Sequence, residues 1–158
     1  MTLGLALACA GIFIAVVFAG IGSAVGIGIA AQAAAGAMTE DPKKFGKYLL
    51  LVALPGTQGI YGFVIGFLTL LKLGILTGNI PSISISQGLN ILFYDAPVGI
   101  AGLISAIHQG KACAAGIEMS SKQPAEVGKA LVMAVFIEFY AILGLLTSFF
   151  LFWFGIKF

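Results

Sequence analysis

The chain has 158 residues, of which 60% are hydrophobic and 9% are charged, whereas average soluble domains carry roughly 25% charged residues. A soluble fold of this length needs a polar surface that this composition cannot supply, so lipid is expected to cover most of the protein. The eight basic residues are all Lys, the net charge is +2 and there is no basic run, which excludes a nucleic-acid-binding protein.

The first predicted transmembrane span runs from Leu3 to Met38. It exceeds the about 20 residues that a helix needs to cross about 30 Å of hydrocarbon. The chain starts without a positively charged region, and the apolar pattern continues far beyond the length of a signal peptide, so we expect a retained helix. Gly20, Gly22, Gly26 and Gly28 lie along it. Small residues at such spacing let helix backbones approach closely in lipid.

Three more spans follow, and the sequence therefore predicts an all-α membrane protein of four transmembrane helices. Polar segments with a Pro, which stops or starts a helix, separate the spans. The fourth span is rich in Phe and Trp, so we expect bulky lipid-facing helices outside a tight layer of Gly/Ala helices. The three later spans are Gly46 to Leu76, Ser86 to Met119 and Ala125 to Phe158, and the polar breaks are Thr39 to Lys44, Thr77 to Ser82 and Ser120 to Pro124.

The lysines predict the orientation. The first and third breaks with their flanks hold five of them, and the second break holds none; these five are Lys43, Lys44, Lys47, Lys122 and Lys129. By the positive-inside rule these two breaks face the cytoplasm, and both termini lie on the outer side. Lys72 and Lys157 are expected at the outer ends, where their side chains can reach the interface.

The chain repeats itself, and one constant shift superposes Ser23 on Ser105 and Pro42 on Pro124. We interpret this as two parallel copies of one helical hairpin, over residues 1–77 and 86–158, joined by a connecting loop at 78–85. The second copy contains the carboxylate Glu138, and the shift places Gly56 at the equivalent position of the first. Repeats of this kind stack side by side, and many copies can close a ring.

Three polar residues are predicted at one depth. The reference points are the predicted span ends on the lysine-rich side of the membrane. Gln58 follows Gly46, Gln109 precedes Ser121 and Glu138 follows Ala125, each by nearly the same number of residues. At the helical rise, these spacings of about 12–13 residues correspond to about 18–20 Å into the membrane-spanning body. We expect the three side chains to meet.

Glu138 is expected to be the single carboxylate deep in the membrane. An acidic residue at the centre of a membrane helix costs about 2.5–3.5 kcal/mol, and such residues usually mark an ion pathway. The alternative is a protonated glutamate with no role.

Three other residues on the third span are expected to have structural roles. Tyr94 and Asp95 are expected to cap the outer end of the third helix, and His108 is expected to be a packed or interfacial neutral side chain.

The second span presents a stripe that matches this acid. Leu54, Thr57, Gln58 and Tyr61 follow the spacing of one helix face. Pro55 has no N–H, which on simple counting frees the carbonyl of Leu51. Carboxylate, amide, hydroxyl and carbonyl oxygens suit small hard cations. A proton site needs fewer oxygens, so the set favours Na⁺ over H⁺.

The stretches LPGTQGIY from Leu54, Gln109-Gly110-Lys111 and EFYAILG from Glu138 resemble the proteolipid subunit of V-type ATPases over essentially the whole chain. The resemblance is greatest to the sodium-pumping bacterial members, called the K subunit or c subunit. It implies a membrane ring of identical subunits in the cell membrane of a prokaryote. Central-stalk subunits of the ATPase and a stator subunit with an Arg would be the partners.

The resemblance also implies roles for single residues. Glu138 would be the Na⁺-binding carboxylate. Gln109, Gln58 and Thr57 would supply side-chain oxygens. Leu54, rather than Leu51, would supply a backbone carbonyl, and Tyr61 would hydrogen-bond Glu138 and close the site. Proton-pumping relatives typically lack the glutamine pair, which favours Na⁺ as the transported ion, with H⁺ as the alternative and no other cofactor.

The sequence predicts a non-catalytic subunit, because it contains no P-loop for ATP. One carboxylate per four helices gives fewer ions per turn and more energy per ion, which favours an ATP-driven pump. Two other classes stay open. A small ion-coupled secondary transporter would usually show inverted rather than parallel repeats, and a purely structural assembly protein would not need a polar site at mid-depth.

Overall fold

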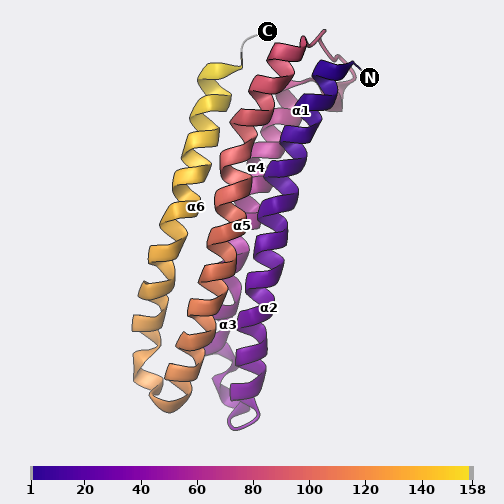
Figure 1. Cartoon of the computed structure of the whole chain (residues 1–158). Coiled ribbons are helices and arrows are strands. Elements are labelled where there is room, and N and C mark those ends of the chain that lie inside the picture. Colours follow the sequence, from indigo (N-terminus) through magenta and orange to yellow (C-terminus); the bar gives the residue numbers. More distant parts are fainter. Residues whose placement is uncertain (1, 157–158) are drawn as a thin grey trace.

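The computed structural model describes residues 2–156, which form four long apolar helices that run side by side (Figure 1). The spans are Leu3–Met38, Pro42–Lys72, Ile85–Lys122 and Pro124–Gly155. The prediction of an all-α protein with four membrane-spanning helices is confirmed, and each predicted span end within the described residues lies within about one helical turn of the observed one. The predicted end at Phe158 and the expected position of Lys157 lie outside the described residues.

Short turns of other helix types interrupt the spans. The first span comprises α1 (Leu3–Phe13), a π-helical turn η1 (Ile14–Phe18) and α2 (Ala19–Met38). The second comprises η2 (Pro42–Lys44), α3 (Phe45–Ala53), the 3₁₀ turn η3 (Leu54–Gly56) and α4 (Thr57–Lys72). After η4 (Ile75–Thr77), the third span is α5 (Ile85–Lys122), and the fourth comprises η5 (Pro124–Glu126) and α6 (Val127–Gly155).

Local sequence explains where the second and third spans begin. Asp41, the residue before Pro42, caps the start of η2, where its Oδ1 accepts a hydrogen bond from the Lys43 N–H at 3.1 Å. Ser84 and Gln87 form a reciprocal capping box at the start of α5, with distances of 3.0 and 3.2 Å. Such side chains satisfy N–H groups that have no partner within the helix.

The helix α5 lies between α6 and the α1–α2 span (Figure 1). Glycines allow the close contact with α2: a Cβ added to Gly22 would lie 2.6 Å from the Cα of Leu103. A Cβ on Gly110 would overlap the backbone of Gly26, and one on Gly26 would overlap the carbonyl of Ala106. Any larger side chain at these positions would push the two helices apart.

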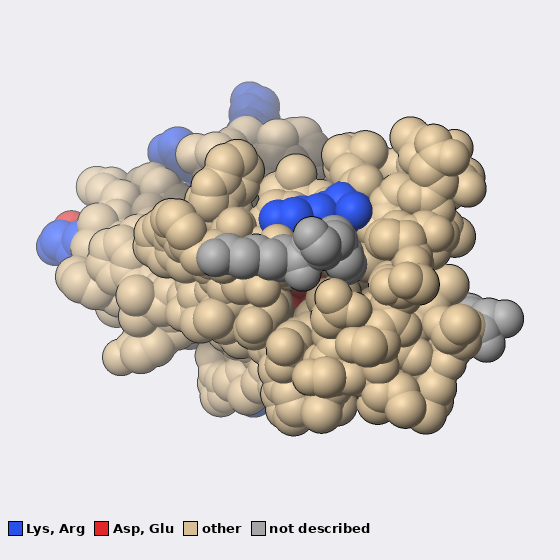
Figure 2. All heavy atoms as spheres, turned by 90° about the horizontal axis from the view of Figure 1, so that it is seen from above, with Lys and Arg blue, Asp and Glu red and all other residues tan. Residues whose placement is uncertain are grey.

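Large apolar side chains cover the outside of the bundle. On α6 the exposed ones include Phe136, Phe139, Phe150, Trp153 and Phe154. Figure 2 looks down on the end of the bundle at which α6 ends, and most of the visible surface is uncharged. A surface of this kind is suited to lipid. The chain is an integral, multi-pass membrane protein.

Candidate ion-binding site

Pro55 determines the backbone conformation on the α3–α4 side of the site. The proline has no N–H to continue the helix, and the chain forms the 3₁₀ turn Leu54–Gly56 between α3 and α4. The Leu54 carbonyl then lies 3.0 Å from Thr57 Oγ1, at the first residue of α4. The carbonyl that joins the polar network is therefore that of Leu54, through Thr57, and simple counting from the proline pointed to Leu51 instead.

The side chain of Glu138 projects from α6 toward the start of α4. Its Oε1 lies 2.7 Å from both Thr57 Oγ1 and the Tyr61 hydroxyl, and the residue is 8% exposed. The hydrogen bond from Tyr61 connects α4 directly to α6. Both contacts lie on one helix face of α4, which is the stripe that the spacing predicted.

Two glutamines complete the network from α4 and α5, and both are fully buried. Gln109 Nε2 donates to the Ala134 carbonyl at 3.1 Å and lies 3.4 Å from Glu138 Oε2. Gln58 Nε2 donates to Gln109 Oε1 at 2.7 Å. Gln109 thus turns its amide nitrogen toward the carboxylate, whereas the family resemblance implied that its oxygen would be a ligand of the ion. Rotation about the terminal bond of the amide exchanges the two.

Thr57 Oγ1 has more oxygen neighbours than it has hydrogens. Besides Glu138 Oε1 at 2.7 Å and the Leu54 carbonyl at 3.0 Å, it lies 3.3 Å from Gln58 Oε1. A hydroxyl has one hydrogen, so it can donate to only one of these three acceptors. The remaining oxygen pairs repel one another, and a small hard cation bound by oxygen ligands would offset that repulsion.

Apolar side chains close the network on both sides along the bundle. Leu51 and Cys113 belong to a fully buried cluster toward the loop between α2 and α3. Ile65 and Val98 belong to a second buried cluster toward the loop between α4 and α5. The polar atoms therefore lie between two apolar layers of the bundle, where unpaired charges are costly.

The structure brings together all the residues that the sequence singled out for this site. Glu138, Gln109, Gln58, Thr57 and Tyr61 form one network of side chains, and Leu54 joins it by its carbonyl. The sequence did not point to the carbonyl of Ala134. This residue lies one helical turn before Glu138 on α6, so the helical period was a signal for it.

Asp95 corrects two expectations. It was expected to cap a helix end and Glu138 to be the single deep carboxylate, but Asp95 is 0% exposed and lies ten residues inside α5. Its Oδ1 accepts the Thr69 hydroxyl at 3.0 Å, and its Oδ2 has no hydrogen-bond partner among the described residues. The Ser84–Gln87 capping box could have revealed the error, because it marks where the helix starts.

Comparison with known proteins agrees with this architecture. The family model for the C subunit of ATP synthase matches residues 10–69 and 96–151, one segment in each predicted hairpin. The chain belongs to the ATP synthase C-subunit family. Both matched segments consist of two spans joined by a polar loop, so the family match includes all four membrane-spanning helices.

Two relatives extend the comparison. The chain is 47% identical over 137 residues to "V-type sodium ATPase subunit K" of Enterococcus hirae, covering 87% of this chain and 84% of that protein. It is 40% identical over 144 residues to "A-type ATP synthase subunit K" of Methanocaldococcus jannaschii, covering 91% of this chain and 60% of that protein. Within the C-subunit family, the chain is thus similar both to a subunit named for an ATPase and to a subunit named for an ATP synthase.

Proposed function

We propose that the chain is the ion-carrying subunit of a membrane rotor ring in a V-type rotary ATPase, and that it binds Na⁺ at Glu138. The family forms rings that work with other subunits, so the protein is an oligomer within a larger complex. The name of the Enterococcus hirae relative, a sodium ATPase subunit, supports Na⁺ as the ion. ATP is hydrolysed elsewhere in the complex.

The observation on which Na⁺ binding rests is the group of oxygen atoms around Thr57 Oγ1. Carboxylate, amide and backbone carbonyl oxygens lie within 3.3 Å of a hydroxyl that can donate to only one of them. We assign Glu138, Thr57, Gln58, the Leu54 carbonyl and, after rotation of its amide, Gln109 as ligands of Na⁺. Tyr61 holds Glu138 in place through its 2.7 Å hydrogen bond.

The charge of the site accounts for how ions are carried. With Na⁺ bound, the single negative charge of Glu138 is cancelled, and the site can face lipid as the ring turns. Without the ion, a carboxylate in hydrocarbon is costly. It must then meet water or the Arg of a stator subunit, and this requirement makes rotation directional. Central-stalk subunits would connect the ring to the ATP-hydrolysing head.

The orientation follows from the lysines. The loops between α2 and α3 and between α5 and α6 lie at one end of the bundle, opposite the N-terminal end of α1 (Figure 1). Lys43, Lys44, Lys47, Lys122 and Lys129 lie at or beside these loops. We propose that this end faces the cytoplasm of a prokaryotic cell and that both termini lie outside the cell membrane.

Labelling with a hydrophobic carbodiimide tests the proposal, because the reagent modifies protonated carboxylates within membranes. Membranes that contain the complex are treated at fixed pH with and without Na⁺, with K⁺ as the salt control, and the modified residue is found by mass spectrometry. We expect modification of Glu138 that Na⁺ slows and K⁺ does not. Protection by raised pH alone would indicate a proton rotor, and a Glu138 that is never modified would contradict the proposal.

The variant Glu138→Gln completes the test. The amide is of similar size and has no charge, so we expect a ring that assembles but neither binds nor transports Na⁺. Normal ion pumping by this variant would remove Glu138 from the mechanism. Asp95→Asn is the matched control, since it also neutralises a buried acid, and it should leave Na⁺-protected labelling of Glu138 unchanged.

A further inference from the structure

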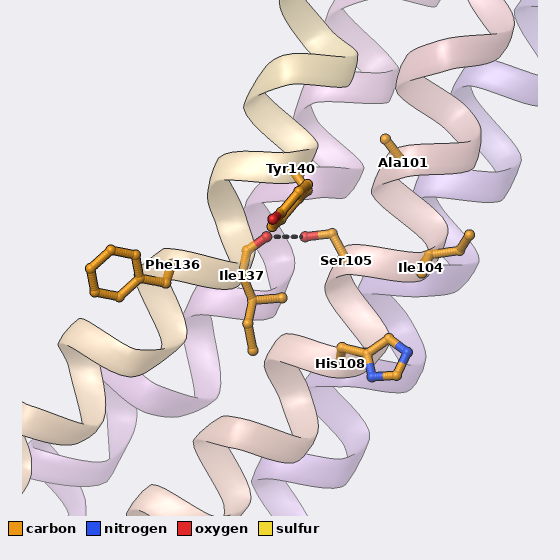
Figure 3. Close-up of a pocket in the computed structure, with 7 residues that line it drawn as sticks. All are labelled: Ala101, Ile104, Ser105, His108, Phe136, Ile137 and Tyr140. Carbon is orange, nitrogen blue, oxygen red and sulfur yellow. Dashed lines mark hydrogen bonds between the residues drawn. The ribbon is translucent and has the colours of Figure 1, made fainter.

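A surface groove of about 360 Å³ lies between the ends of α4 and α6 and has a lysine in its lining. Leu68, Leu71 and Lys72 line it from α4, and Phe152 and Trp153 line it from α6. The seven residues drawn around a larger groove, between α5 and α6, include no lysine and no acidic residue (Figure 3). The smaller groove is therefore suited to a ligand that is both apolar and negatively charged.

Lys72 lies at the level that lipid headgroups occupy. It is the last residue of α4 and of the span Pro42–Lys72. That span has 31 residues, which at the helical rise correspond to about 46 Å, close to the about 40–45 Å of a bilayer with its headgroups. Trp153 agrees with this level, because tryptophan is enriched where hydrocarbon meets water.

The ammonium group of Lys72 forms no ion pair among residues 2–156. The ion pairs that the structure describes are made by other lysines, near the loops at the opposite end of the bundle. The Lys72 Nζ lies instead 5.0 Å from the centre of the Phe152 ring, and Phe152 is 4% exposed. A cation–π contact stabilises an ammonium group but does not cancel its charge.

The acidic residues of the described chain are placed away from Lys72 or are buried. Glu40, Asp41, Glu118 and Glu126 lie at or near the loops at the opposite end of the bundle. The remaining two, Asp95 and Glu138, are buried, and neither forms an ion pair among the described residues. A counter-charge for Lys72 would therefore come from outside residues 2–156.

We propose that this groove binds an anionic phospholipid, with its phosphate at Lys72 and an acyl chain along Leu68 and Leu71. These three residues follow the spacing i, i+3 and i+4, so they share one face of α4, with the charge at the headgroup end. Trp153 is 61% exposed and forms the α6 side of the groove. The lipid binds each chain at this surface whichever ion the protein carries.

The charge of the lipid decides the preference. A zwitterionic phospholipid brings its phosphate together with a cationic group of its own, which competes with the ammonium of Lys72. A lipid with a net negative charge, such as phosphatidylglycerol, has no such group. One lysine close to anionic lipid corresponds to about a fivefold gain in binding. We therefore expect a preference of this size for phosphatidylglycerol over phosphatidylcholine.

Trp153 is a built-in probe of the groove, because it is the single tryptophan of the chain. Purified full-length protein is reconstituted into phosphatidylcholine vesicles with increasing fractions of a lipid that is brominated near the headgroup end of its acyl chains. Bromine quenches tryptophan fluorescence on contact, so quenching reports which lipid occupies the groove. Brominated phosphatidylglycerol should reach half-maximal quenching at about one fifth of the fraction that brominated phosphatidylcholine needs.

Three variants assign the preference to the lysine. Lys72→Gln removes the charge, so the two brominated lipids should quench equally, whereas Lys72→Arg keeps the charge and should keep the preference. Lys122→Gln is the matched control, since it removes the same charge from an exposed position at the opposite end of the bundle, and it should also keep the preference. Labelling of Glu138 that Na⁺ slows should be unchanged in all three, which shows that each variant is folded.

Equal quenching by the two lipids in the unchanged protein would overturn the inference, and so would a preference that Lys72→Gln retains. Inorganic phosphate, added at constant ionic strength, should not relieve the quenching; relief would assign the groove to a free anion instead of a lipid. The measurements contain no Na⁺ step, so these failures would leave the proposed function standing. Absence of Na⁺ protection of Glu138 in the unchanged protein would contradict the proposed function and leave the lipid preference intact.

Discussion

The two glutamines of the site have different positions relative to the carboxylate. Gln109 lies 3.4 Å from Glu138 and also holds the Ala134 carbonyl, whereas Gln58 reaches Glu138 only through Gln109 and Thr57. Removing Gln109 therefore breaks the connection between α5 and α6 at the site. Removing Gln58 removes one oxygen near Thr57 and leaves that connection in place.

Substitution of these glutamines should weaken Na⁺ binding unequally. For Gln109→Ala we expect a loss of about 1.5–3 kcal/mol, which raises the Na⁺ concentration for half-maximal protection about tenfold to hundredfold. For Gln58→Ala we expect about tenfold or less. Carbodiimide protection, titrated with Na⁺ at fixed pH and with pH in the absence of Na⁺, measures both.

The binding of H⁺ should change less than that of Na⁺ in both variants, because a proton needs only the carboxylate and one hydrogen-bond partner. Equal changes for the two ions would indicate a proton site. Gln32→Ala, at an exposed position of α2, is the control and should alter neither curve.

Asp95 and Thr69 form an isolated polar pair between apolar residues. Ile65 and Leu73 lie one helical turn on either side of Thr69, and both are fully buried. The hydrogen bond of 3.0 Å from Thr69 is the single one made by the carboxyl group among the described residues. A buried acid with one partner depends strongly on that partner.

Thr69→Val should destabilise the protein by about 1–3 kcal/mol, because both oxygens of Asp95 would then lack a hydrogen bond. Thermal unfolding of the purified protein in detergent measures the change. Thr147→Val is the control, since the Thr147 hydroxyl bonds the Leu143 carbonyl of its own helix at an exposed position, and its loss should be small. In the double variant Thr69→Val/Asp95→Asn the two effects should not add, since the residues are in contact. Full additivity would argue against the pair.

At the scale of elements, the contact between α2 and α5 depends on residues without a side chain. Gly26 and Gly110 bring the two backbones together, and this contact places Gln109 beside α4. The position of the Leu54 carbonyl depends on a different feature, the 3₁₀ turn at Pro55, which directs this carbonyl toward Thr57.

Gly110→Leu should destabilise the protein by about 1–3 kcal/mol, because a side chain there overlaps the backbone of Gly26 and α5 must move. The shift should also disturb Gln109, so that Na⁺ protection of Glu138 weakens with stability. Gly128→Leu is the control at an exposed position with open space, and its effect should stay within about 0.5 kcal/mol. Equal melting temperatures for the two variants would contradict the close packing.

At the scale of the whole molecule, the internal sequence repeat contains the carboxylate of the candidate ion site once, as Glu138. Gly56 stands where the repeat would place a second acid, and the side chain of Ile27 covers it. The proposed rotor therefore has one site for every four helices, and each ion is driven by a larger share of the energy of a turn.

We expect purified rings to bind one Na⁺ per chain, because each chain of four spans has one such site. Equilibrium binding of radioactive Na⁺, related to protein concentration, measures the ratio. Glu138→Gln should bind none, which controls for ions held at the surface. Two ions per chain, or transport of one ion for every two helices, would contradict the assignment.

The sequence by itself determined the four spans, their parallel repeat and the common depth of Gln58, Gln109 and Glu138. Hydrocarbon thickness and the helical rise are fixed quantities, so position along a membrane helix follows from counting residues. The stripe that contains Thr57 and Tyr61 followed from the helical period in the same way.

Only the tertiary structure decided what lies beside each residue at a given depth. It placed Asp95 in the interior, selected the Leu54 carbonyl and turned the nitrogen of Gln109 toward Glu138. Lateral contacts depend on how closely and at which rotation neighbouring helices pack. In this protein that packing is set by glycine contacts such as Gly26 with Gly110 and by the turn at Pro55, and these act across spans that are distant in sequence.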